Sequence, residues 1–399
     1  MKPAFFISNR NKIIEATQEG LLVFAGYRQL QQKGDMAARF EQEANFWWLT
    51  GIEAPGWWLM IDRHSARSYL IAPEVEAVHE LFDGSLSNGD AQRVSGVDEV
   101  LSAKDGEALL KKYATEHTVV FTLGKDSMAK HYDFVLNPGP MAMLSKLKRL
   151  YEIVIDCRID LARLRAIKQP EEIAAIKKAV ALTVDAFKDI KPRLGSLRHE
   201  YQVEAEFSHY FRSRGAEGHA YEPIVAGGKN ACTLHYTQNN SSLKKSELLL
   251  LDIGARVGGY AADITRTYGI GEPTERQLAV HQVVEAAHRE IIALLKPGLS
   301  IEVYAEKVDE IMKSALGELG LLKSPTDYRK YFPHAISHGL GIDVHDSLGR
   351  PSEFLEGMVL TVEPGIYVPE EGIGVRIEDD ILITAEGAES LSAALPTSL

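Results

Sequence analysis

The sequence predicts a two-domain protein of the α/β class, with an α+β arrangement of helices and antiparallel hairpins in its second half. Near the N-terminus, short apolar stretches such as WWLMID and SYLIAP alternate with helical segments. Beyond residue 220, apolar stretches that contain acidic residues are separated by glycine-rich turns, which indicates paired strands.

A composition shift along the chain predicts the domain boundary. All four tryptophans lie before residue 60, whereas nearly all the glycine, histidine and acid clusters lie after residue 220. We therefore predict domains at residues 1–156 and 157–399. Trp57 and Trp58 are expected to be core residues of the first domain, rather than to reach a neighbouring active site.

Three helices of the second domain have clear start signals. Pro170 is followed by two acids, which suits a first helical turn, because proline lacks only an unpaired donor and acids favour the positive end of the dipole. Thr274 and Gln277 form a capping box. Ser300 is expected to cap a further helix that reaches about Leu316.

The composition argues against several classes of partner. With 44 basic and 56 acidic residues the net charge is −12, which argues against non-specific binding to nucleic acid and to anionic membranes. The sequence contains no apolar run of the roughly 18 residues that a membrane helix needs. Two cysteines, Cys157 and Cys232, do not make a disulfide framework, so a reducing cytoplasm is the expected location.

Two predicted hairpins carry facing acids. In residues 248–268, a loop symmetric about Val257 and Gly258 would place Asp252 directly opposite Asp263, with Cβ atoms roughly 4.5–5.5 Å apart. Two like charges at that distance destabilise the pair unless a cation lies between them. For a single aspartate, a turn or surface role would be the better interpretation.

The second hairpin repeats the arrangement. A turn centred on Glu370 and Glu371 places Glu363, in an apolar strand, opposite Glu378. Four solvated surface acids would be a poor explanation for two such hairpins. The sequence therefore predicts a buried metal site.

The segment FPHAISHGLGIDVHD adds His334, His338 and His345. A His-Glu-x-x-His zinc site is excluded, since Ala335 stands where its glutamate would be. One of these histidines with four carboxylates would suit two divalent ions, for which Mn²⁺ is favoured and Co²⁺ or Zn²⁺ are alternatives.

Five segments together resemble the pita-bread metallopeptidases of the Xaa-Pro branch, which comprises Xaa-Pro aminopeptidases (aminopeptidase P) and Xaa-Pro dipeptidases (prolidases). These segments are TLHY (233–236), LLLDIGARVGGYAADITRT (249–267), SHGLGIDVHD (337–346), LTVEPGIYV (360–368) and GVRIEDDILIT (374–384). The resemblance is strong from about residue 160 to 390. It implies a creatinase-like N-terminal α/β domain that helps wall the cleft and form a homodimer, followed by a pita-bread catalytic domain.

The resemblance also implies roles for single residues. The implied metal ligands are Asp252, Asp263, His338, Glu363 and Glu378. His235 matches the histidine that stabilises the tetrahedral intermediate. His334, His345 and Arg376 match positions on the side that holds the proline, and we count His345 among the catalytic residues as well.

The expected reaction is hydrolysis of the Xaa-Pro bond by a hydroxide that bridges two metal ions. Glu363 would take the proton of the attacking water and deliver it to the proline nitrogen, while His235 donates to the oxyanion. We favour a dipeptide substrate, whose free carboxylate Arg376 or Arg350 would bind. The alternatives are an aminopeptidase that cuts longer peptides and, for Arg376, an ion pair with Asp379 or Asp380.

Two rival functions are a non-catalytic pita-bread binding module and a metal-free amidinohydrolase of the creatinase type. Proteins of both classes lack metal-ligating residues that this chain retains. A nucleophilic Cys232, three residues before His235, would explain none of the facing acids.

Overall fold

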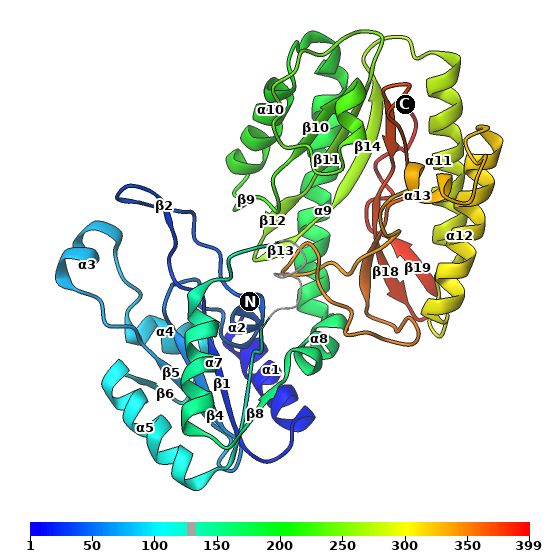
Figure 1. Cartoon of the computed structure of the whole chain (residues 1–399). Coiled ribbons are helices and arrows are strands. Elements are labelled where there is room, and N and C mark those ends of the chain that lie inside the picture. Colours follow the sequence, from blue (N-terminus) through cyan, green and yellow to red (C-terminus); the bar gives the residue numbers. More distant parts are fainter. Residues whose placement is uncertain (126–132) are drawn as a thin grey trace. The chain divides into compact units, whose positions relative to one another are not determined.

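The computed structural model describes residues 1–125 and 133–399 (Figure 1). The chain divides into two compact units, Met1–Leu164 and Arg165–Leu399. The division lies eight residues after the boundary predicted from composition, within helix α8 (Arg158–Ala166). Among the helices described, none is long and apolar enough to cross a membrane.

The first unit is built on a six-stranded mixed sheet in the order β6-β5-β4-β1-β7-β8. The central strand β1 pairs antiparallel with β4 and parallel with β7. The strands are β1 Leu21–Ala25, β4 Trp58–Asp62, β5 Arg67–Ile71, β6 Glu99–Leu101, β7 Val119–Thr122 and β8 Ile153–Asp156, with a separate hairpin of β2 Gln31–Lys33 and β3 Met36–Ala37. The described helices are α1 Pro3–Ala16, α2 Ala44–Thr50, α3 Ala77–Asp83, α4 Asn88–Ser95, α5 Ala103–Glu116 and α7 Pro138–Leu150.

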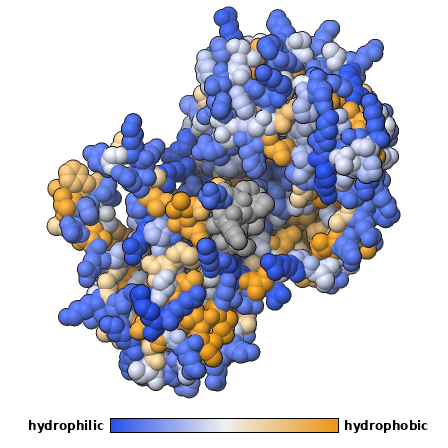
Figure 2. All heavy atoms as spheres, viewed as in Figure 1, coloured by the Kyte–Doolittle hydropathy of each residue, from blue (hydrophilic) through white to orange (hydrophobic). Residues whose placement is uncertain are grey.

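Burial in this unit follows the apolar pattern of the sequence. Trp57 and Trp58 are buried, as are the other two tryptophans, so the core assignment is confirmed. Helix α3 contrasts with this: none of its residues is buried, and Leu81 and Phe82 are 82% and 79% exposed. Figure 2 shows the corresponding apolar patch over α3, at the left edge of the view.

The second unit contains long helices with strands between them (Figure 1). The predicted start signals are confirmed: α9 begins at Pro170, Thr274 and Gln277 form the capping box of α11, and the Ser300 hydroxyl caps α12. The helices are α9 Pro170–Ile190, α10 Glu200–Ser213, α11 Glu275–Leu294, α12 Ile301–Glu318 and α13 Asp327–Tyr331, with short 3₁₀ turns η1 Lys191–Ser196 and η2 Gly228–Cys232.

The strands of the second unit form four small sheets, in the orders β10-β11-β14, β13-β12-β9, β15-β18-β19 and β16-β17. Their bounds are β9 Gly218–His219, β10 Ile224–Gly227, β11 Leu248–Ile253, β12 Ala255–Val257, β13 Tyr260–Ala261, β14 Ile264–Gly269, β15 Val359–Val362, β16 Gly365–Val368, β17 Ile373–Arg376, β18 Asp379–Thr384 and β19 Gly387–Ser390. The apolar faces of α11 and α12 pack with β15 to β18 in one core. Glu363 follows the end of β15 and Glu378 precedes the start of β18, so this core supports both acids.

Candidate metal and active site

The first hairpin brings Asp252 and Asp263 together, although in a different register from the one predicted. Asp252 on β11 pairs with Thr265 on β14, two residues beyond Asp263. The turn uses Gly258 and Gly259, whose φ angles of 60° and 81° suit a two-residue hairpin loop, instead of Val257 and Gly258. A shift of two residues keeps a side chain on the same face of the sheet. The expected face was therefore right and the expected pairing wrong.

The register of the second hairpin is confirmed on both sides of its acids. Val362 pairs with Asp379 in β15-β18, and Gly365 pairs with Arg376 in β16-β17. Glu363 and Glu378 occupy matching places between these two ladders, and both are largely or fully buried.

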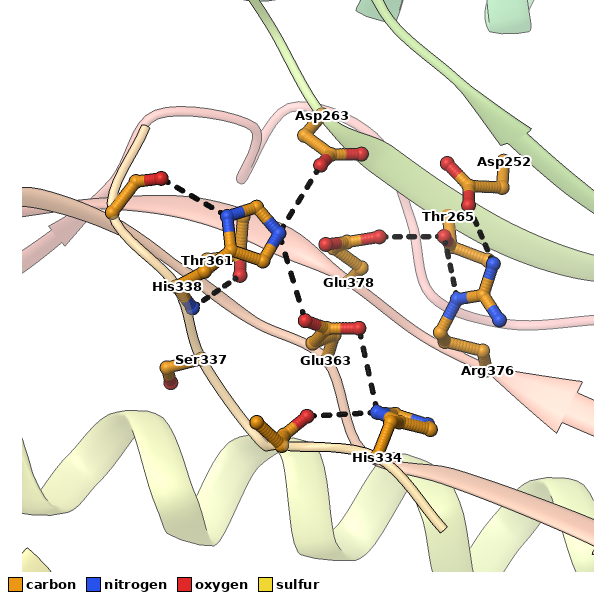
Figure 3. A network of polar contacts seen from close by, with 12 residues as sticks. Asp252, Asp263, Thr265, His334, Ser337, His338, Thr361, Glu363, Arg376 and Glu378 are labelled. Carbon is orange, nitrogen blue, oxygen red and sulfur yellow. Dashed lines mark hydrogen bonds and ion pairs between the residues drawn. The ribbon is translucent and has the colours of Figure 1, made fainter. Parts of the chain in front are cut away.

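The acids of both hairpins meet His338 (Figure 3). Its Nε2 lies 3.4 Å from Oδ2 of Asp263 and 3.6 Å from Oε1 of Glu363. Ligand atoms of Asp263, His338 and Glu378 all lie within 4.8 Å of one another. Nδ1 of His338 is 3.0 Å from the carbonyl oxygen of Gly339, an arrangement that orients the ring and leaves Nε2 for a metal ion.

Charge in this cluster is strongly unbalanced. Burial, followed by repulsion from neighbouring carboxylates, raises the pKa of Glu378 well above its ordinary value. Burial also raises the pKa of Asp252, and that of Glu363 to about 7. Burial opposes ionisation of His338 and Asp263, yet their mutual contact raises the pKa of His338 to about 9 and lowers that of Asp263. This set of buried carboxylate oxygens and one imidazole nitrogen suits the binding of divalent cations. Their positive charge would offset the negative charge of the carboxylates.

Two hydroxyl residues that the sequence did not single out hold these acids in place. The Tyr221 hydroxyl lies 2.7 Å from Oδ1 of Asp263 and within hydrogen-bond distance of Oδ1 of Asp252. Burial raises the pKa of Tyr221 well above its ordinary value, so it is a neutral donor. Thr265 donates to Oε2 of Glu378 at 2.6 Å. The sequence signal for Thr265 was its place on the hairpin, whereas Tyr221 had none.

Asp380 also helps to hold the metal cluster in place. Its Oδ2 accepts a hydrogen bond from the backbone N–H of Asp263 at 3.0 Å, which fixes the main chain at that acid. The sequence offered Asp380 only as a partner for Arg376, and that alternative is wrong. Arg376 pairs with Asp252, while Arg266 occupies Asp379.

A chain of hydrogen bonds runs from Arg376 to His334. Nη1 of Arg376 donates to the Tyr367 hydroxyl at 2.9 Å, and that hydroxyl lies 2.9 Å from Nε2 of His334. Because the carbonyl oxygen of Ala335 can only accept, Nδ1 of His334 carries a proton and donates to it at 2.7 Å. In the neutral ring Nε2 is then an acceptor, so the Tyr367 hydroxyl donates to it. Burial and Arg376 lower the pKa of His334 to about 3, so the ring is neutral.

The remaining predicted site residues are all exposed. His345 is exposed, and its ring centroid is 4.4 Å from that of His338, so it borders the metal cluster. His235 is exposed in a loop after η2. Arg350 is exposed, with a φ of 55°, in the loop that follows His345. Cys232 donates to the carbonyl of Ile373, and burial raises its pKa to about 11, which does not suit a nucleophile.

Comparison with known proteins identifies the family. Residues 174–385 match metallopeptidase family M24, and residues 6–121 match the N-terminal domain of aminopeptidase P. The Xaa-Pro aminopeptidase of Escherichia coli (strain K12) is 34% identical to this chain, and the alignment covers 98% of this chain and 94% of that protein. The Xaa-Pro aminopeptidase 3 of Homo sapiens is 33% identical over 92% of this chain and 76% of its own.

Solved structures show the same fold. Proline aminopeptidase P II from Yersinia pestis has a TM-score of 0.86 at 31% identity, covering 100% of this chain and 98% of that chain. Aminopeptidase P from E. coli with the inhibitor Pro-Leu has a TM-score of 0.85 at 30% identity, covering 100% and 96%. The two family matches and this full-length likeness agree with the buried cluster of acids and histidine. The chain belongs to the pita-bread metallopeptidases of family M24 and carries the N-terminal domain of aminopeptidase P.

Proposed function

We propose that this protein is a metal-dependent Xaa-Pro aminopeptidase, which removes the N-terminal residue from peptides with proline in second place. The proposal rests on one cluster of side chains in the second unit. It brings the ligand atoms of Asp263, His338 and Glu378 together with the carboxylates of Glu363 and Asp252. The non-catalytic alternative has no such support, since all five predicted ligands are present in one unit.

The relatives support an aminopeptidase over the dipeptidase that the sequence favoured. The relatives and solved structures described above are named as Xaa-Pro aminopeptidases or aminopeptidase P, and the alignments cover most of both chains. The placement of Arg376 agrees. Its Nε, Nη1 and Nη2 each donate to a group of the chain itself, which makes it a poor anchor for the carboxylate of a dipeptide.

We propose that Glu363 moves a proton during the reaction. One carboxylate oxygen lies near His338 and the other is 3.5 Å from Nδ1 of His334. Two bound metal ions would polarise the scissile carbonyl and supply an activated water. In the metal-free protein burial raises the pKa of Glu363 to about 7, and bound divalent ions would lower it, so the carboxylate would be ionised and able to accept a proton.

We keep three histidines in the roles that the resemblance implied. His235 would donate to the developing oxyanion, and His334 and His345 would border the proline. A neutral His334, held between Tyr367 and Ala335, offers a ring face without a charge to a proline that lacks an N–H donor. We also retain Mn²⁺ as the favoured ion, with a homodimer and a cytoplasmic location as predictions.

The test compares substrates of increasing length. Purified protein supplied with Mn²⁺ should release the first residue from Ala-Pro-Ala and from longer Ala-Pro peptides, and should cut the dipeptide Ala-Pro poorly. The matched peptide Ala-Ala-Ala controls for proline specificity. Efficient cleavage of Ala-Pro alone would instead restore the dipeptidase, and absence of cleavage in the whole series would refute the proposed function.

A further inference from the structure

A buried carboxylate outside the metal cluster gathers four hydrogen-bond donors. Glu200 is the first residue of α10, and its exposed fraction is 0%. Its Oε1 accepts from the backbone N–H of Gly227 at 2.8 Å and from Nδ2 of Asn230 at 2.9 Å. Its Oε2 accepts from the Tyr236 hydroxyl and from the backbone N–H of Ser241, both at 2.8 Å. These contacts fill the acceptor sites of an ionised carboxylate.

The four donors lie on both sides of His235. Gly227 and Asn230 precede it, and Tyr236 and Ser241 follow it. Glu200 therefore holds the two ends of the segment 227–241 together. Residues 233–240 form no helix or strand, and a backbone ladder does not fix them. The side-chain contacts to Glu200 therefore help to fix where this segment lies, together with the backbone hydrogen bond from the Glu200 N–H to the carbonyl of Ser241 at 3.0 Å.

Neighbouring contacts support the same segment. The Tyr236 ring packs on a small apolar cluster that includes Ala226 and Tyr367, so its ring and its hydroxyl are both fixed. Asn239 is buried in the left-handed region, with a φ of 45°, and its Oδ1 accepts from the N–H of Val225 at 3.0 Å. His235 is thus adjacent to Tyr236, which cannot shift without breaking its hydrogen bond to Glu200.

We propose that Glu200 is a positioning residue that fixes His235 in the geometry needed to donate to the substrate oxyanion. The proposal rests on the proposed function, because that function gives His235 its task. Glu200 itself contacts no reacting atom. Charge-assisted hydrogen bonds are stronger and more directional than neutral ones, which suits a carboxylate that must hold an irregular segment.

The direct test is Glu200→Gln with Glu206→Gln as its matched control. A glutamine amide presents N–H groups to one pair of donors, so two of the four lose their acceptor. Glu206 lies on the same helix but is partly exposed and pairs with Arg193. We expect Glu200→Gln to lower kcat for Ala-Pro-Ala by up to roughly 10²-fold, as for other small misplacements, with KM and metal content unchanged. Glu206→Gln should resemble the wild type.

A double-mutant cycle with His235→Ala identifies the route of the effect. If Glu200 acts through His235, then Glu200→Gln should change kcat by less than about twofold once His235 is alanine. Losses that multiply in the double variant, or a loss of metal from Glu200→Gln, would overturn the proposal. Should that variant fail to fold, Tyr236→Phe removes one donor and keeps the ring, and the same cycle applies.

A measurement without substrate separates this proposal from the proposed function. Amide hydrogen exchange across residues 227–241 should be faster in Glu200→Gln than in the wild type or Glu206→Gln, because the N–H of either Gly227 or Ser241, whichever faces the new amide group, loses its acceptor. Unchanged exchange there would refute the positioning role. Failure of the wild type to cut any Xaa-Pro peptide would instead refute the proposed function, whatever the exchange shows.

Discussion

Nη2 of Arg376 donates to Oδ2 of Asp252 at 2.5 Å, so a buried guanidinium holds one of the predicted metal ligands (Figure 3). The same side chain donates through Nε to Thr265, which in turn donates to Glu378. Arg376 thereby links two ligands from different hairpins. This position indicates that Arg376 orders the ligands of the metal site.

Arg376→Ala should consequently reduce activity by roughly 10–100-fold through disordered ligands, with little change in KM for a peptide substrate. Metal content by elemental analysis and steady-state kinetics check this together. Arg350→Ala is the control, since it deletes an exposed arginine and should leave metal content unchanged. A steep rise in KM with normal kcat and metal content would assign Arg376 to the substrate carboxylate instead.

Removal of metal should abolish peptidase activity. The buried acids of the site carry more negative charge than His338 and Arg376 can balance, and divalent ions would complete the balance. Dialysis against a chelator should eliminate hydrolysis of Ala-Pro-Ala, and Mn²⁺ or Co²⁺, with Zn²⁺ as a further candidate, should restore it. Full activity in protein shown by elemental analysis to be metal-free would contradict the metallopeptidase mechanism.

Glu363→Gln should lose far more in kcat than in substrate affinity. The change keeps the shape of a side chain between His338 and His334 but removes the group that takes up and returns the proton. Kinetics on protein with measured metal content separate this loss from loss of a ligand. Near-normal turnover with metal bound would exclude Glu363 as the proton carrier.

His235→Ala should retain metal and lose roughly 10²–10³ in kcat, the effect expected for removal of an oxyanion donor. The reason is its place in an exposed loop outside the cluster of Asp263, His338 and Glu378. Metal content and kcat are the two measurements. Loss of a metal ion from this variant would make His235 a ligand and contradict the assignment.

The metal-free protein should lose stability as pH rises from about 6.5 to 9, above the range in which the buried neutral His334 and His288 gain stability. Glu363 binds its proton more tightly when folded, since burial raises its pKa from 4.5 to about 7, and contacts with Asp263 and Glu363 raise that of His338 from 6.5 to about 9 despite its burial. Stability from each group is complete below its unfolded pKa and is lost as pH passes its folded pKa. Thermal unfolding against pH, with and without Mn²⁺, checks this. A metal-free Tm that rises across this range would contradict it.

Local sequence signals were sufficient for much of the fold and for the residue types of the site. The starts of α9, α11 and α12 followed from side chains within four residues, because capping is a local hydrogen bond. The register of the second hairpin followed from its turn, so the position of that turn was enough to match Glu363 with Glu378.

The register of the first hairpin could not be predicted from the local sequence alone. The choice of Gly258 and Gly259 for the turn moved the pairing by two residues. Close packing also contributed, since a Cβ on Gly254 would come within 1.8 Å of the carbonyl oxygen of Ala262. Such an approach between two strands depends on atoms in space and leaves no periodic pattern in the sequence.

The sequence by itself determined which acids and histidines are available, on which strands they lie and which family they resemble. Only the tertiary structure decided that Arg376 holds Asp252, that Tyr221 joins Asp252 to Asp263, and that Glu200 closes the segment around His235. These contacts join residues that are 27 to 124 positions apart in the chain. Hydrogen bonding and burial act over a few ångströms in space, so the pKa values and orientations of the site exist only once packing has brought those residues together.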